Sequence, residues 1–79
     1  MADEKFEIIF YLSASGVECR VEYDAKENYD AARAILDARL HAAPVFRDGE
    51  LVPHSVYYYV EDKRLEDFRQ YLQAIPKEP

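Results

Sequence analysis

The sequence is poor in the residues that build metal centres, disulfides and phosphate loops. Its 79 residues include one cysteine, two histidines, two glycines and no tryptophan. A single cysteine excludes a disulfide within the chain, and neither CxxC nor HxxxH occurs. Two glycines are too few for a glycine-rich phosphate loop. The sequence therefore offers no cofactor motif, and we expect no cofactor to be bound.

Long apolar runs and basic residues are also scarce. The longest apolar runs, 8–12 and 56–60, have five residues each, whereas a membrane-spanning helix needs ~20. Sixteen acidic residues outnumber ten basic ones, and the net charge is −6. This charge repels nucleic-acid backbones, so we expect no direct nucleic-acid binding. The short apolar runs lead us to expect no membrane partner. The acidic N-terminus is not typical of a signal peptide, and a free thiol suits a reducing cytoplasm, the expected location.

Alternating apolar residues predict a β-hairpin over residues 6–23. The period of two places eight side chains on one face: Phe6, Ile8, Phe10, Leu12, Val17, Cys19, Val21 and Tyr23. The small residues 13–16 predict a four-residue turn, and this turn sets Phe10 opposite Cys19. The rest of the chain must cover this apolar face.

A helix is predicted from about 28 to 42, where apolar residues recur at helical spacing. Asp24 or Asn28 is the expected N-cap, because short polar side chains accept the free amide hydrogens of the first turn. His41 falls in the expected last turn, where a cation interacts favourably with the helix dipole. Pro44 is expected to end the element.

The dipeptide Asp48-Gly49 predicts a second hairpin, with a type I′ turn between residues 45–47 and 50–52. Pro53 cannot donate to a sheet ladder, so we expect this hairpin to be short and at a sheet edge. The β-rich run 56–60 follows. The sequence leaves open whether residues 50–60 form one strand or two.

Negative charge at Glu61-Asp62 opens a last amphipathic helix, which Pro76 ends. The resulting order is ββαββα. We therefore predict an α+β fold, a two-layer sandwich in which two helices cover one face of a mainly antiparallel sheet. The chain is short enough for a single domain over residues 1–79, with flexible ends at 1–5 and 76–79.

Three consecutive tyrosines are the most unusual feature of the sequence. Strand alternation sends Tyr58 toward the core and sends Tyr57 and Tyr59 to the opposite face. If the two hairpins are neighbours in the sheet, Ile9 and Tyr11 share that open face. Exposed tyrosines are favoured contact residues, since they bring large rigid area and a hydroxyl group.

The leading hypothesis is a non-enzymatic module that binds another protein, or a second copy of itself, through this aromatic sheet face. The predicted interface consists of Tyr57, Tyr59, Ile9, Tyr11 and Arg20. Two structural alternatives remain open. The tyrosines can simply pair across strands and stabilise the sheet, and the Arg20 stem can shield Ile9 and Tyr11.

A second hypothesis places function in the acidic surface, which could mimic nucleic acid and occupy the groove of a nucleic-acid-binding protein. Its predicted residues are Glu7, Glu18, Glu22 and Asp24. Small phage-encoded inhibitors, including anti-CRISPR proteins, are similar in size and charge. Binding of this kind would weaken steeply with salt, because exposed charges are screened.

A third hypothesis is a small enzyme or metal site built from His41, His54 and Cys19. The two histidines flank the second hairpin and could meet in space. Cys19, however, falls on the inward face of its strand with no neighbouring base, which is typical of a core residue. We predict no catalytic, cofactor-binding or metal-binding residues.

Overall fold

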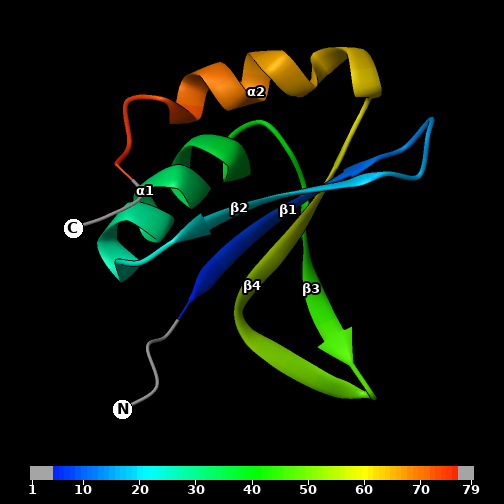
Figure 1. Cartoon of the computed structure of the whole chain (residues 1–79), viewed down its shortest axis with the longest axis vertical. Helices are drawn as coiled ribbons and strands as arrows, with labels where there is room; N and C mark the ends of the chain where they lie inside the picture. The colour runs from blue at the N-terminus through cyan, green and yellow to red at the C-terminus, as the bar shows by residue number, and fades with distance from the viewer. Residues whose placement is uncertain (1–4, 77–79) are drawn as a thin grey trace.

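The structure is a computed structural model that describes residues 5–76, drawn as a ribbon in Figure 1. The elements in chain order are β1 (Phe6–Leu12), β2 (Glu18–Tyr23), α1 (Lys26–Asp37), β3 (Ala42–Arg47), β4 (Glu50–Val60), the 3₁₀ turn η1 (Asp62–Arg64) and α2 (Leu65–Leu72). We predicted flexible ends at residues 1–5 and 76–79. Except for Lys5 and Pro76, these ends lie outside the described residues.

The four strands form one mixed sheet in the order β2-β1-β4-β3. Both hairpins are antiparallel, whereas the central strands β1 and β4 pair in parallel. Both helices lie on the same side of this sheet (Figure 1). The predicted α+β class and the ββαββα order are confirmed. The parallel contact is what makes the two hairpins neighbours.

The first hairpin has the predicted register. Phe10 pairs with Cys19 and Ile8 with Val21. At the turn, the Leu12 amide donates to the Val17 carbonyl at 2.8 Å. Gly16 has a φ of +75°, a conformation that glycine adopts without a steric penalty. Local alternation and a small-residue turn are thus sufficient to define this unit.

The predicted bounds of the first helix are wrong. Helix α1 spans Lys26–Asp37 rather than 28–42, and its N-cap, Ala25, makes no side-chain cap hydrogen bond. Asp24 instead forms an ion pair with Lys5 at 2.9 Å. The C-terminal end is wrong because residues 42–47 pair with β4, and this sheet pairing overrides the apolar spacing that continues past Asp37.

Pro44 therefore lies inside β3 rather than ending the helix, and His41 lies in the connection before that strand. β3 is an edge strand, where proline is tolerated because one side of the strand needs no ladder hydrogen bonds. The predicted edge position of the second hairpin is confirmed for β3 alone, because β4 pairs with both β1 and β3. The strand register shifts between Pro44 and Phe46.

The predicted Asp48-Gly49 turn has positive φ at both central residues, +52° and +81°, as a type I′ turn requires. Residues 50–60 form one strand of 11 residues, so this hairpin is longer than predicted. A positive φ of +65° at His54 marks a local irregularity in this strand. The strand continues through Pro53, and its last six residues pair with β1.

The core lies between the sheet and the two helices. Its buried members from the sheet are Phe6, Ile8, Phe10, Leu12, Tyr23, Val56, Tyr58 and Val60. The buried members from the helices are Tyr29, Ala32, Leu36, Leu65, Phe68 and Leu72. Burial of this apolar surface is the main stabilising term available to a chain without disulfides. Because both helices lie on the core side, no helix within residues 5–76 covers the opposite face of the sheet.

Candidate functional site

The open face of the sheet is defined by the parallel pairing of β1 with β4. This pairing sets Ile9 opposite Tyr57 and Tyr11 opposite Tyr59. All four side chains face away from the helices, because their neighbours along each strand belong to the core. The structure thus brings together the four aromatic and apolar residues predicted for the interface.

Tyr59 is the most exposed member of this face. The residue is 59% exposed, and its ring meets the ring of Tyr11 edge to face, with centroids 5.4 Å apart. Such tilted pairs contribute about 0.5–1.5 kcal/mol beyond the area that they bury. Tyr11 itself is half-buried, and its hydroxyl lies near the turn glycine, Gly16. The pair therefore presents one supported and largely exposed ring.

Hydrogen bonds hold the end of the sheet near Tyr59 in place. The Ser13 amide donates to the Val60 carbonyl at 3.0 Å, and the Ala14 amide donates to Asp62 Oδ1 at 3.0 Å. Hydrogen bonds from the turn, that of Ser15 foremost, hold the pKa of the Asp62 carboxyl below its usual value. The turn after β1 is thus tied to the chain that follows Tyr59.

Tyr57 reaches across the face toward the edge of the sheet. Its hydroxyl donates to Glu18 Oε2 at 3.0 Å. Since Tyr57 lies on β4, Glu18 on β2 and strand β1 between them, the ring must cross β1 on the open face. The hydrogen bond to Glu18 raises the pKa of the Tyr57 hydroxyl, and partial burial adds to this effect.

Arg20 and Glu7 form a second polar contact on the same face. Arg20 Nε lies 3.1 Å from Glu7 Oε2, and the Glu7 side chain is only 15% exposed. The geometry is that of an ion pair without a directed hydrogen bond to Oε2. Arg20 is half-exposed, and its stem lies opposite Ile9 in the register. Arg20 thus occupies the predicted face, paired with an acid of the neighbouring strand.

Ile9, which was predicted as an interface residue, is not exposed on the open face. It is only 1% exposed, yet it lies outside the core beneath the helices. The sheet register sets Ile9 between Arg20 on β2 and Tyr57 on β4. The long side chain of Tyr57 reaches across β1, and that of Arg20 reaches toward it. Ile9 therefore supports the surface from below, and Arg20 and Tyr57 form its cover.

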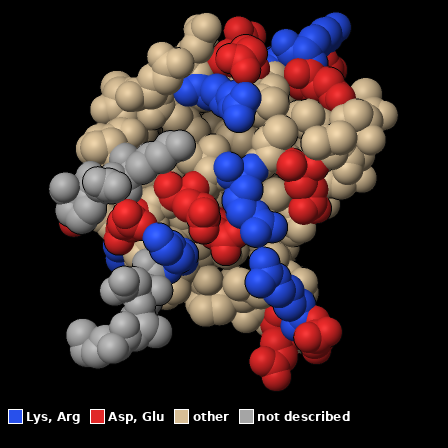
Figure 2. Space-filling view, viewed as in Figure 1, with Lys and Arg blue, Asp and Glu red and all other residues tan. Residues whose placement is uncertain are grey.

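The four predicted acidic residues are spread over several local contacts. Glu7 pairs with Arg20, Glu18 accepts the Tyr57 hydrogen bond and Asp24 pairs with Lys5. On the side of the molecule drawn in Figure 2, acidic and basic side chains alternate instead of forming one acidic field. This alternation reduces the negative potential that mimicry of a nucleic-acid backbone requires.

The residues of the metal hypothesis lie apart along the sheet. The register pairs Ala42, next to His41, with Tyr58, four residues along β4 from His54. The His54 ring contacts Phe6, with centroids 4.7 Å apart, and Cys19 is half-buried beside the core. Within residues 5–76, no group of three or more His, Cys, Asp and Glu side chains is arranged to hold a metal ion.

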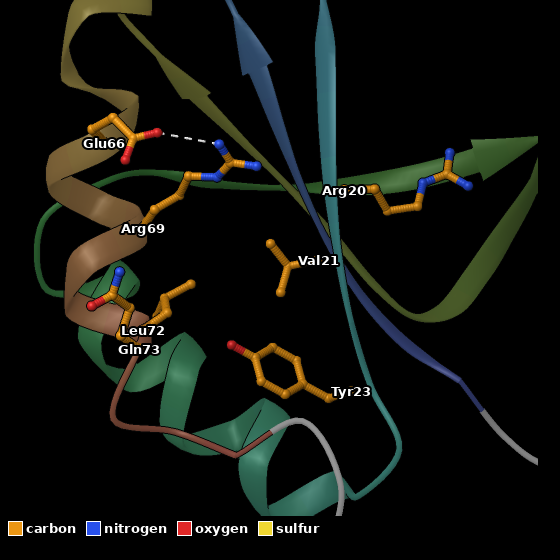
Figure 3. A pocket seen from close by; sticks show the side chains of 7 residues that line it. All are labelled: Arg20, Val21, Tyr23, Glu66, Arg69, Leu72 and Gln73. Atoms are coloured by element: carbon orange, nitrogen blue, oxygen red, sulfur yellow. Dashed lines mark hydrogen bonds and ion pairs between the residues drawn. The ribbon is translucent and has the colours of Figure 1, made fainter.

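Two further features were not singled out from the sequence. Phe46 and Leu51 face each other near the second turn, and both are exposed. Exposed apolar pairs at hairpin ends have no sequence signal that separates them from core positions. The second feature is a groove of about 330 Å³ between β2 and α2, into which Val21, Tyr23 and Leu72 point (Figure 3).

Comparison with known proteins returned no match for this chain among protein-family models, curated proteins or solved structures. No helix within the described range is long and apolar enough to cross a membrane.

Proposed function

We propose that this chain is a non-enzymatic protein-binding module whose contact surface is the open sheet face. Tyr59 is the central contact residue, Tyr11 supports its ring, and Tyr57 and Arg20 form the polar margin. Interfaces of this kind combine an exposed aromatic ring with a rim of charged and hydrogen-bonding groups. The observation that carries the proposal is the exposure of Tyr59 within an otherwise ordered face.

The ordering of this face favours binding. Tyr57 is held by Glu18, Arg20 by Glu7, and Tyr59 by ring contact with Tyr11. Side chains that are already fixed lose little entropy when a partner docks, so more of the contact energy appears as affinity. A tyrosine ring adds large area at the expense of only two rotatable bonds.

Tyr71 provides a matched comparison within the same chain. It is 46% exposed on the surface of α2 and also makes an edge-to-face contact, with Phe68. However, the Arg39 guanidinium lies 4.6 Å from its ring centroid and occupies one ring face. Tyr71 therefore has less free aromatic surface than Tyr59, and it lies on the helical side of the molecule.

The test is capture of partners from a nuclease-treated lysate by wild type, Tyr59→Ala and Tyr71→Ala, followed by mass spectrometry. We expect a partner that wild type and Tyr71→Ala retain and Tyr59→Ala loses. For a central tyrosine the expected loss in affinity is about 2 kcal/mol, or about 30-fold. Equal retention by Tyr59→Ala and wild type would overturn the proposal.

Salt separates this function from acidic mimicry of nucleic acid. Contacts through Tyr59 are mainly apolar, so the same capture at high salt is expected to retain the partner. Binding through Glu22 and the other acids would fall steeply, because the screening length shrinks from about 10 Å at 0.1 M to about 3 Å at 1 M salt. A partner lost at high salt, and kept by Tyr59→Ala, would favour mimicry.

A further inference from the structure

The two edges of the sheet differ in how well they are protected. Strand β3 contains Pro44, which has no amide hydrogen, and its register shifts beside that residue. Strand β2, Glu18–Tyr23, has a continuous register and contains neither proline nor glycine. Proline and irregularities block edge-to-edge pairing, whereas a regular edge strand invites it. The β2 edge is therefore the one open to another strand.

The backbone of β2 presents free groups along this edge. The Leu12 amide points to β2 and the Ser13 amide points to β4, so even-numbered residues of β1 bond to β2. Their partners on β2 are the odd-numbered residues, including Cys19 and Val21. The amide and carbonyl groups of the even-numbered residues, Glu18, Arg20 and Glu22, consequently point outward. Among residues 5–76, no strand pairs with them.

We propose that the β2 edge pairs with the β2 edge of a second copy of this chain, antiparallel, about a two-fold axis at Cys19. This proposal does not depend on the function proposed for Tyr59. In this register Glu18 lies opposite the second copy's Arg20, and Val17 lies opposite the second copy's Val21. The charged residues Glu18 and Arg20 then lie opposite residues of opposite charge, and Val21 lies opposite another valine.

Charge selects this register over its neighbours. An axis at Arg20 sets Arg20 against Arg20 and Glu18 against Glu22. An axis at Val21 sets Glu18 against Asp24. Like charges directly opposite each other destabilise a strand pair. Only the axis at Cys19 gives two Glu–Arg pairs without a like-charge pair.

The side chains available on the open face suit these pairs. Arg20 contacts Glu7 through Nε, which leaves its two terminal nitrogens for a second carboxylate. Glu18 accepts the Tyr57 hydrogen bond through Oε2, which leaves Oε1 for a guanidinium. Figure 3 shows Arg20 pointing away from α2, so this contact lies on the open face.

The helical side of the edge is also complementary. Val17 is 52% exposed, which is high for an apolar residue next to a strand. Val21 is half-buried and points into the groove between β2 and α2 (Figure 3). Pairing sets the second copy's Val17 beside Val21, at the mouth of this groove, and removes both from water.

Cys19 reports directly on this geometry. Its backbone bonds to β1, so the two copies of Cys19 form a pair without hydrogen bonds, with Cα atoms about 4.5 Å apart. That separation lies within the disulfide range. In the test, diamide oxidises the purified protein and takes up the two protons and two electrons that a pair of thiols releases. We expect a disulfide-linked dimer under denaturing, non-reducing electrophoresis.

The control is the double variant Cys19→Ser/Val21→Cys, which moves the only thiol by two residues on the same face. With the axis at Cys19, the two position-21 sites lie four residues apart, about 13 Å along the strands. We expect its cross-link to form at least about tenfold more slowly, because this distance exceeds the disulfide range. Faster cross-linking of the variant than of wild type would overturn the proposed register.

Exchange of the charges at positions 18 and 20 tests the strand pairing without a cross-linking reaction. Glu18→Arg and Arg20→Glu each set like charges opposite each other twice, and we expect either to weaken the dimer about tenfold in analytical ultracentrifugation. The double variant Glu18→Arg/Arg20→Glu restores opposite charges, and we expect its affinity to return toward wild type. A wild-type chain that stays monomeric at all concentrations would overturn the proposal, as would a double variant no stronger than the single ones.

Discussion

Tyr57, Tyr58 and Tyr59 follow one another on β4, yet each has a different environment. Tyr58 is fully buried, and its hydroxyl donates to Asp37 Oδ1 at 2.5 Å and accepts from Arg33 Nε at 3.3 Å. Tyr59 is mostly exposed, and its ring contacts the ring of Tyr11 edge to face. Tyr57 is intermediate, with its hydroxyl bonded to Glu18.

The contrast follows from two facts: side chains of a strand alternate between faces, and both helices cover the same face. One strand thereby supplies the centre of the core and the centre of a surface. The two faces are expected to respond differently to substitution. We expect substitutions in the core to change stability, and, on the proposed function, substitutions on the open face to change association.

The largest difference is expected between Phe10 and Tyr59. Phe10→Ala removes a fully buried ring beneath the helices, and we expect the free energy of unfolding to fall by about 3–5 kcal/mol. Tyr59→Ala removes mainly the contact with Tyr11, about 0.5–1.5 kcal/mol. Urea denaturation measures both. If Phe10→Ala does not fold, Phe10→Leu keeps the ranking measurable, and a larger loss for Tyr59→Ala than for Phe10→Leu would contradict it.

The next largest difference is expected between two hydroxyl groups. Tyr58→Phe removes bonds to Asp37 and Arg33 in a partly buried setting. Hydrogen bonds to charged groups contribute about 1.5–3 kcal/mol, so we expect a loss of that size. Tyr57→Phe removes a solvent-exposed bond to Glu18, and we expect less than about 1 kcal/mol. Equal losses in urea denaturation would show that the two faces are not distinct in this respect.

Alkaline pH is expected to destabilise the buried face through Tyr58. Burial, together with the hydrogen bond donated to Asp37, raises the pKa of the Tyr58 hydroxyl. The unfolded chain loses this proton near pH 10, before the folded chain does. The unfolded state then binds fewer protons, so the free energy of unfolding falls as pH rises above about 10.

The control for this pH effect is Tyr58→Phe, which has no such proton. Tyr23 and Tyr29, whose pKa values burial also raises, are present in both proteins. We therefore expect both to lose stability above about pH 10, with a shallower decline in the variant. Identical slopes of the urea midpoint against pH would show that Tyr58 does not control this decline.

The smallest predicted effects compare adjacent isoleucines on opposite faces. Ile8 is buried in the helical core, and Ile9 is buried beneath Arg20 and Tyr57. We expect Ile8→Val and Ile9→Val each to reduce the free energy of unfolding by about 0.5–1.5 kcal/mol. A negligible effect of Ile9→Val alone would mean that the polar side chains above it do not form an effective cover.

Local patterns predicted the parts of the fold that depend on neighbouring residues. The first hairpin was correct in register because alternation and the 13–16 turn act together over 18 residues. The Asp48-Gly49 turn was correct because its positive φ values need those residue types. The end of α1 was wrong, since the pairing of Ala42 with Tyr58 is a long-range contact with no local signal.

The candidate surface was predictable only in outline. Alternation correctly placed Tyr57 and Tyr59 on the face away from the core. The burial of Ile9 was missed because it depends on the parallel pairing of β1 with β4 and on Tyr57 reaching Glu18 across β1. The complementarity of the β2 edge became visible only once the sheet order was known.

Nitration of tyrosine rings in the free and partner-bound protein tests the central claim most directly. Tetranitromethane modifies accessible rings, and mass spectrometry of peptides identifies them. In the free protein we expect Tyr59 and Tyr71 to react and Tyr58 to be protected, as their exposures indicate. In the complex we expect protection of Tyr59 and continued reaction of Tyr71. Protection of Tyr71 with Tyr59 still reactive would place the interface on the helices and contradict the account.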